Sequence, residues 1–226
     1  MPPTKTRVPT RATPAAPPAR GDSARDILRV AAELFRQRGY TDTSLAAIGE
    51  RLGMSAAALY YHYRSKEEIL LAYLENALRD VTVRVEAALS TVSSPEQRLR
   101  VFTITHATFQ LEPLGDLSAE ARATHYGISQ LIGGLDPRNR RKMAKQLRAY
   151  VDIPRAIIQE GIAQGVFRPV DVTASVFAIL GMVEFAPLWF RPDGQLDSEG
   201  VASLYASFAV RMVSALPSDG VGHRQA

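Results

Sequence analysis

Side chains that can bind phosphate and base edges are concentrated in residues 43–66. Hydroxyls, phenols and free backbone amides are groups that contact the sugar–phosphate backbone in protein–DNA complexes, and small side chains let a helix approach a groove closely. This stretch offers all of these groups at the spacing of two short helices. We expect double-stranded DNA to be contacted by Thr43, Ser44, Ser55, Ala56, Ala57, Tyr60, Tyr61 and Lys66.

Residue combinations that catalyse reactions or hold metal ions do not occur in the sequence. The four histidines, His62, His106, His125 and His223, lack metal-ligand spacing, and the chain has no cysteine for a structural zinc site. The sequence also contains no phosphate-binding glycine loop, no nucleophile elbow and no compelling acid/base pair. We therefore expect neither an enzyme nor a protein that uses a metal or cofactor.

Two short helices joined by a tight turn must position the DNA-binding groups. Apolar residues recur at three- and four-residue intervals between positions 45 and 52, which places them on one face of a helix. Thr43 or Ser44 can cap this helix, and Gly53 can end it in a left-handed conformation. Ser55 can cap the second helix, which is too short to be stable alone and needs support from neighbouring helices.

Several linked motifs in this part of the chain resemble the DNA-binding domain of TetR/AcrR-family transcriptional regulators. They are Gly39-Tyr40, Thr43-Ser44-Leu45 with Ile48, Gly53-Met54-Ser55, Leu59-Tyr60-Tyr61-His62-Tyr63 and Ser65-Lys66-Glu67-Glu68. Many members carry Lys or Arg and then Gly where this chain has Ala56-Ala57. We therefore expect contacts to thymine methyl groups rather than charged contacts to bases.

The resemblance implies a homodimer that binds a palindromic operator and is released by a small-molecule effector held in its C-terminal domain. Repression rather than activation also follows from the resemblance alone. The alternative is an effector-independent architectural DNA-binding protein. The large set of apolar helices after residue 101 favours the regulator, because an architectural protein needs no ligand cavity.

The composition is that of an ordinary soluble protein, with 226 residues, 46% hydrophobic and 22% charged. Four basic residues, Lys5, Arg7, Arg11 and Arg20, precede the first acid at Asp22, so the N-terminal tail alone supplies charge equal to the net +4. The proline-rich N-terminus lacks the apolar segment of a signal peptide, and we expect the protein to be cytoplasmic.

Helical periodicity continues through the chain, and no alternating run is long enough to indicate a sheet. We expect an all-α protein of about nine helices, with a disordered basic tail at 1–21 and a helix-turn-helix domain at 22–68. A helical effector-binding and dimerisation domain should span 69–216 and a flexible tail 217–226. The first helix should be capped by Asp22 or Ser23, and a capping box from Ser65 to Glu68 should start a long helix.

Residues 172–190 are apolar on almost every side, with Glu184 as the only charge. The length of this segment is at the lower limit for a membrane span, and Gly181, Glu184 and Pro187 argue against one. A helix of this kind in a soluble protein needs apolar partners on two faces. We expect these to be the domain core and a second subunit that pairs through the last two helices. The expected interface residues are Val176, Leu180, Leu204, Tyr205, Phe208 and Met212.

Two further motifs look like the C-terminal domain of KstR-like regulators of steroid and fatty-acid catabolism: Gly165-Val166-Phe167-Arg168-Pro169 and the segment 188–196. This resemblance implies a lipid-like or acyl-CoA-like effector. Candidate effector-binding residues are Phe102, His106, Phe109, His125, Tyr126, Ile153, Ile157, Val183, Glu184 and Trp189. Two alternatives stay open for Glu184: it pairs with Arg191 or Arg211, or it lines the effector cavity.

Overall fold

The computed structural model describes residues 20–111 and 131–214, and all regular structure in these ranges is helical. The helices are α1 (Arg20–Arg38), α2 (Leu45–Leu52), α3 (Ala56–His62), α4 (Lys66–Leu89), α5 (Pro95–Leu111), α8 (Pro137–Ala163), α9 (Val172–Trp189) and α10 (Ser198–Val213). A 3-10 helix, η2, spans Ile132–Gly134. The eight α-helices of the described ranges confirm the all-α prediction.

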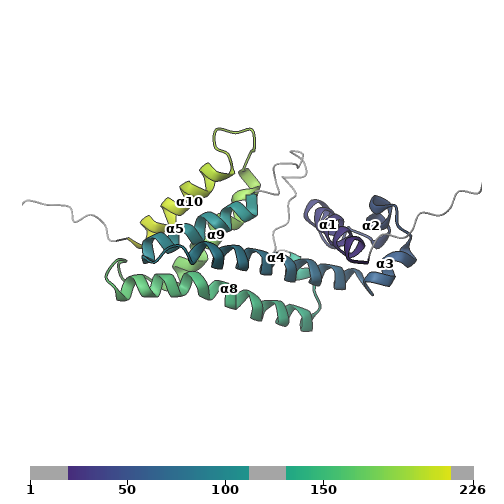
Figure 1. Cartoon of the computed structure of the whole chain (residues 1–226), viewed down its shortest axis with the longest axis horizontal. Helices are drawn as coiled ribbons and strands as arrows, with labels where there is room; N and C mark the ends of the chain where they lie inside the picture. Colours follow the sequence, from purple (N-terminus) through teal and green to yellow (C-terminus); the bar gives the residue numbers. More distant parts are fainter. Residues whose placement is uncertain (1–19, 112–130, 215–226) are drawn as a thin grey trace, which may run out of the picture.

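The three N-terminal helices gather at one end of the molecule, and α4 runs from them into the C-terminal helices (Figure 1). Fully buried side chains from all four helices form the core beneath the turn: Phe35, Ile48, Leu59, Ile69 and Leu70. The short α2 and α3 are therefore held in place by α1 and the first turns of α4, as their length requires.

Serine caps begin three of these helices at the expected positions. The Oγ atoms of Ser44, Ser55 and Ser65 each accept a hydrogen bond from the amide three residues later, at 3.0, 3.2 and 3.1 Å. Gly53 ends α2 with φ at +64°, a conformation that glycine adopts at little steric cost. The Glu68 carboxylate accepts from the Arg64 amide rather than from the cap residue itself, so the capping box is shifted by one residue.

Two expectations for the N-terminal part differ from the structure. Helix α1 begins at Arg20, so residues 20 and 21 are helical rather than part of the tail, and Asp22 and Ser23 lie inside the helix instead of capping it. The remaining tail positions, 1–19 and 217–226, lie outside the described residues, as do residues 215 and 216 of the expected C-terminal domain. Most of residues 117–132, whose pattern predicts a further helix, also lie outside them. Pro154 lies inside α8 without ending that helix.

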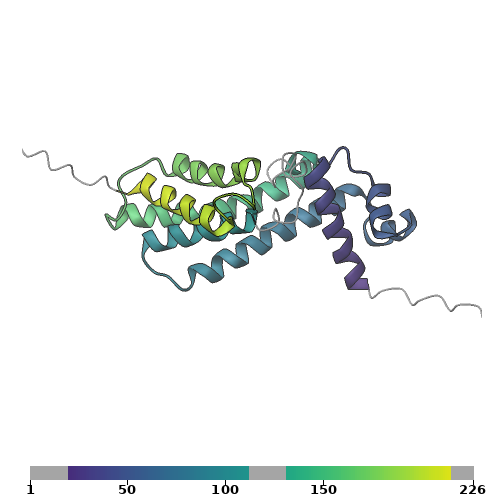
Figure 2. The ribbon, with the colours of Figure 1, turned by 90° about the horizontal axis from the view of Figure 1, so that it is seen from above.

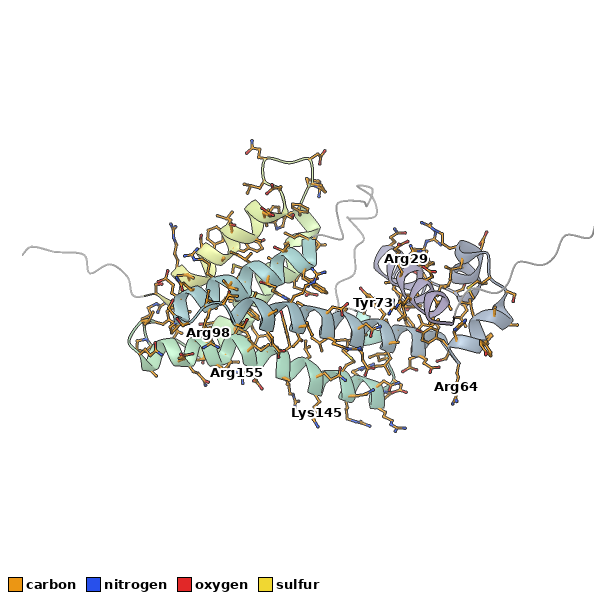
Figure 3. The ribbon with its side chains drawn as sticks, in the orientation of Figure 1. Arg29, Arg64, Tyr73, Arg98, Lys145 and Arg155 are labelled. Carbon is orange, nitrogen blue, oxygen red and sulfur yellow. The ribbon has the colours of Figure 1, made fainter. Side chains whose placement is uncertain are left out.

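Helix α5 lies at the centre of the C-terminal domain, where it contacts α4, α8, α9 and α10 (Figures 1 and 2). Helices α4 and α8 run side by side in both views. Arg98 of α5 forms an ion pair with Glu160 of α8 close to the far end of the domain (Figure 3). Through the packing of α4 against α8, the end of the molecule that carries α1, α2 and α3 is connected to the interior of the C-terminal domain.

Helix α9 is buried on one side only. Val176, Ile179 and Val183 pack into the core, whereas Phe177 and Phe185 on other sides of the helix are exposed. Helix α9 is long and apolar enough to cross a membrane by length and composition alone, with 33% of the segment buried. In this structure it packs against α5, α8 and α10.

Candidate functional site

The outward side of α3 and of the turn before it carries most of the residues expected to contact DNA. Tyr60 and Tyr61 are 54% and 65% exposed, while Leu59 of the same helix is buried in the core. Ser44, Ser55 and Ala57 are exposed at the start of α2 and α3, and Ala56 is the first residue of α3. Phenols, hydroxyls and small side chains therefore share one accessible surface, as close approach to a DNA groove requires.

Thr43 does not belong to this surface, contrary to the expectation from sequence. Its side chain is buried, and its Oγ1 donates to the carbonyl oxygens of Gly39 at 2.8 Å and Leu34 at 3.3 Å. The hydroxyl therefore holds the loop between α1 and α2 against the end of α1. Ser44, the other candidate, is the residue that caps α2.

Lys66 also points inward rather than toward solvent. Its Nζ donates to the backbone carbonyls of Tyr40 at 2.7 Å, Thr43 at 2.8 Å and Thr41 at 3.3 Å, and it lies 4.2 Å from the centre of the Tyr40 ring. Burial lowers the pKa of Lys66, and the Asp42 carboxylate opposes this effect. An ammonium group has three hydrogens to donate, so these carbonyls occupy the donors that a phosphate would need. Lys66 therefore joins the start of α4 to the α1–α2 loop.

Replacing Lys66 with methionine should lower the free energy of unfolding by about 2 kcal/mol, because hydrogen bonds from a charged donor are lost and carbonyls are left unpaired. The dependence of operator binding on salt should keep its slope, since no phosphate contact is removed. Denaturant titration and binding isotherms at several salt concentrations would measure both quantities.

Arg64→Met is the matched control, because it removes the same charge at an exposed position that points away from the helices (Figure 3). Its effect on stability should stay within about 0.5 kcal/mol. A smaller salt slope in Lys66→Met with unchanged stability would instead make Lys66 a phosphate ligand.

A cavity of about 230 Å³ lies inside the C-terminal domain between α4, α5, α8 and α9. Its walls are mainly apolar, with a few polar groups. It is lined by Leu78, Val81, His106, Phe109, Gln110, Leu147, Tyr150, Val151, Phe177, Leu180, Gly181 and Glu184. Three of the residues expected to bind an effector, His106, Phe109 and Glu184, therefore line the same cavity.

Other candidate effector residues lie elsewhere. Phe102, Ile157 and Val183 are fully buried in the core, and Ile153 lines a separate groove between α4 and α8. Trp189 is exposed, and its indole Nε1 donates to the Tyr205 hydroxyl at 3.1 Å. His125 and Tyr126 lie outside the described residues.

Sequence reasoning missed the lining residues that α4 and α8 supply, including Leu78, Val81, Leu147 and Tyr150. Leu78 and Val81 were visible as part of the apolar stripe of α4. Periodicity shows that such residues face inward, but it does not distinguish a cavity wall from a packed core.

A buried histidine–tyrosine pair is the main polar feature of the cavity. The Tyr150 hydroxyl lies 2.8 Å from Nδ1 of His106, and the rings of Phe102 and His106 stack with centroids 6.0 Å apart. Burial lowers the pKa of His106 to about 4 and raises the pKa of Tyr150. Both side chains are therefore uncharged near neutral pH.

Glu184 provides a second polar position in the cavity wall. Its carboxylate accepts a hydrogen bond from Nε2 of Gln110 at 3.1 Å, across from α5. Of the two alternatives left by the sequence, lining the cavity agrees with its position.

Exposed apolar side chains gather on α9 and α10. Leu204 and Phe208 of α10 are exposed, as expected for an interface, and Met212 is half-buried. Val176 is fully buried inside the protomer, Tyr205 is largely buried, and Leu180 lines the cavity. Val176 cannot contact a partner, because its side chain faces the core. The α9 residues that do face outward are Phe177, Phe185, Leu188 and Trp189.

Two protein-family models match the chain, one in each part. The model described as "Bacterial regulatory proteins, tetR family" matches residues 27–73, and that described as "Tetracyclin repressor-like, C-terminal domain" matches residues 92–213. The transcriptional repressor KstR2 of Mycolicibacterium smegmatis is 27% identical over 200 residues, which cover 88% of this chain and 92% of the relative. This match confirms the resemblance to KstR-like regulators.

Solved structures agree with this assignment. The regulator PfmR from Thermus thermophilus is 38% identical, with a TM-score of 0.70 and coverage of 82% of this chain and 97% of that chain. The structure of AibR in complex with isovaleryl coenzyme A and operator DNA is 29% identical, with a TM-score of 0.71 and coverage of 84% and 97%. The chain therefore belongs to the TetR family: it is a helix-turn-helix transcriptional regulator and not an enzyme.

Proposed function

We propose that this regulator is a repressor that binds a palindromic operator as a homodimer and leaves it when a small hydrophobic or acyl-CoA-like effector occupies the cavity. The observation that carries this proposal is the position of the cavity. Its walls include α4, which continues directly from the helix-turn-helix, so a ligand there contacts the helix that carries the DNA reader. We place this function in the cytoplasm, where a bacterial operator is accessible.

The relatives support the class of effector and the direction of regulation. AibR was solved with isovaleryl coenzyme A and operator DNA, and KstR2 is described as a repressor. The cavity of about 230 Å³ suits the acyl portion of such a ligand, because apolar side chains make up most of its lining. A coenzyme A group would have to extend beyond this cavity.

Operator binding by a homodimer requires two copies of α3 at the spacing of successive major grooves, about 34 to 36 Å. An effector that binds better to a form of the dimer with a different spacing lowers operator affinity by its differential binding. Exposed apolar residues of α9 and α10 supply the surface that we propose joins the two protomers.

Contacts between α4 and the N-terminal end of α8 support a route for this coupling. Oε1 of Glu67 accepts from the Asp136 amide at 2.8 Å and from Nδ2 of Asn139 at 2.9 Å, and Glu75 forms an ion pair with Lys142 at 2.6 Å. Farther along α8, Leu147, Tyr150 and Val151 line the cavity. Movement of α8 caused by a ligand therefore acts on the first turn of α4.

The loop that precedes α8 reaches the DNA-binding domain directly. A Cβ atom on Gly134 would come within 2.6 Å of Cδ1 of Tyr40, so η2 lies against this ring with no space between them. Tyr40 also lies beneath Lys66. The same ring thus contacts both the start of α4 and the segment that leads into α8.

Replacing Glu67 with alanine should weaken the response to effector more than it weakens the binding of effector. The release of operator by saturating ligand should fall by about 5- to 10-fold, within the range of coupling energies measured for residues between linked sites. Anisotropy of labelled operator with and without ligand would report the response, and calorimetry would report ligand affinity.

The control for Glu67→Ala is Glu86→Ala, which removes an exposed carboxylate near the other end of the same helix. That variant should respond to effector as the unsubstituted protein does. A full response in Glu67→Ala would mean that the contact between Glu67 and α8 does not transmit the effect of the ligand.

The proposed function is tested by a thermal-shift screen of acyl-CoAs, sterol fragments and other hydrophobic compounds, followed by operator binding with each hit. A compound that raises the melting temperature and releases the operator supports the proposal. Operator binding that no stabilising compound alters would favour the effector-independent architectural protein.

A further inference from the structure

The polar groups of the cavity are arranged as two pairs in an otherwise apolar lining. One pair is His106 with Tyr150, and the other is Gln110 with Glu184. Among the described residues, Tyr150 is the hydrogen-bond partner of His106. The Tyr150 hydroxyl contacts Nδ1 of the imidazole ring and leaves Nε2 unengaged by this bond. His106 is one of the lining residues. Because Tyr150 engages Nδ1, we take Nε2 as the ring nitrogen that a ligand in the cavity would meet.

The bond to Tyr150 determines what Nε2 can offer. A phenol hydroxyl is a strong donor, and a neutral imidazole has one nitrogen that accepts and one that donates. When the Tyr150 hydroxyl donates to Nδ1, the single ring hydrogen must reside on Nε2. This arrangement holds while both groups are uncharged, and burial favours the uncharged forms by lowering the pKa of His106 and raising that of Tyr150.

We infer that the cavity selects effectors that carry an uncharged carbonyl oxygen, which accepts a hydrogen bond from the Nε2 hydrogen of His106. Ketones, esters, thioesters and amides belong to this class. Tyr150 is a positioning residue, because it orients the imidazole and sets its tautomer without contacting the carbonyl. The inference rests on the proposed function in one respect, namely that the effector occupies this cavity.

The same lining disfavours two related classes of ligand. A saturated hydrocarbon in the cavity would cover the Nε2 hydrogen without offering it an acceptor, which costs binding free energy. A free carboxylate loses its hydration on entering, and the described lining residues include no lysine or arginine to compensate its charge. An uncharged carbonyl avoids both costs.

Three probes with the same chain length separate these classes: 2-octanone, octane and octanoate. Their affinities for the full-length protein would be measured by calorimetry and thermal shift at neutral pH. After each affinity is corrected for the probe's own transfer free energy from water to hydrocarbon, we expect 2-octanone to bind roughly 10-fold more tightly than either of the others, the effect of one buried hydrogen bond. Equal corrected affinities for 2-octanone and octane, or a higher corrected affinity for octanoate, would overturn the inference.

Substitutions at His106 and Tyr150 then test whether these two residues cause the preference for 2-octanone over octane. His106→Phe keeps a flat ring but has no hydrogen to donate, so the preference for 2-octanone over octane should disappear while octane affinity changes little. Tyr150→Phe should reduce the preference by less. Nitrogen-15 NMR of the histidine ring should show the hydrogen on Nε2 in the unsubstituted protein and a mixture of tautomers in Tyr150→Phe, a change that a purely structural role would not cause.

The outcomes distinguish this inference from the proposed function. If octane and 2-octanone have equal corrected affinities and both release the operator, carbonyl selection is wrong and effector-controlled repression stands. If none of the probes binds and no compound of the wider screen alters operator binding, both are wrong. A 2-octanone preference that persists in His106→Phe would assign the carbonyl to another group and overturn the role of His106.

Discussion

Replacing Phe35 with alanine is expected to lower the free energy of unfolding by about 3 to 5 kcal/mol, the cost of removing a large side chain from a site that cannot collapse around the space left behind. Phe35 lies on α1 and is fully buried, with its ring centre 5.5 Å from that of Tyr40. The side chains of Ile48 on α2 and Leu59 on α3 belong to the same core. The substitution should therefore destabilise mainly the N-terminal domain that contains α3.

Urea unfolding followed by circular dichroism would measure this change at one fixed protein concentration, because the proposed dimerisation would contribute to apparent stability. Arg25→Ala, at an exposed position of the same helix, should stay within about 0.5 kcal/mol of the unsubstituted protein. Operator binding should be weakened in Phe35→Ala under conditions that leave the Arg25 variant fully active. A cost below about 1 kcal/mol would show that the helix-turn-helix can repack without this ring.

Replacing Phe185 with glutamate is expected to raise the dissociation constant of the proposed dimer on the order of 100-fold, the effect of losing a central aromatic contact and burying a charge in its place. Phe185 is 61% exposed on α9, and Phe177 of the same helix and Leu204 and Phe208 of α10 are exposed as well. Because a protomer alone reads only one half of a palindromic site, affinity for the operator should fall as well.

Sedimentation equilibrium would determine the dissociation constant, and anisotropy of labelled operator would determine binding. Val83→Glu is the matched control, since Val83 is 57% exposed but lies on α4 rather than on α9 or α10. The control should remain dimeric. If Phe185→Glu remains dimeric at micromolar concentration, the protomers must pair through another surface.

Much of the DNA-binding domain could be predicted from the sequence because its signals are local. The Ser44 and Ser55 hydroxyls accept from amides three residues later, and the Gly53 amide donates to the Glu50 carbonyl three residues earlier. Apolar spacing identifies the buried face of each short helix. These interactions have the same geometry wherever the helix is placed. The motifs shared with the TetR family lie in the same segment, which is why the family could be recognised before any tertiary contact was known.

The directions of Thr43 and Lys66 could not be derived in this way. Both have the side-chain chemistry to bind phosphate, yet both donate to carbonyl oxygens within the protein. Lys66 bonds to residues 23 to 26 positions earlier in the chain, so its role depends on how the α1–α2 loop packs against α4. Local sequence does not contain that relation.

By itself, the sequence determined the helical class, the caps and turn of the DNA reader, and the apolar character of α9, because these properties arise from neighbouring residues. Tertiary structure decided which side of α9 faces the core, that Val176 is buried while Phe185 is exposed, and that His106 meets Tyr150 from 44 residues away. The physical reason is that helix rotation and pairing are set by the packing of several distant segments at once. A periodic pattern shows that a face is apolar, but only that packing shows whether the face meets the core, a cavity or open surface.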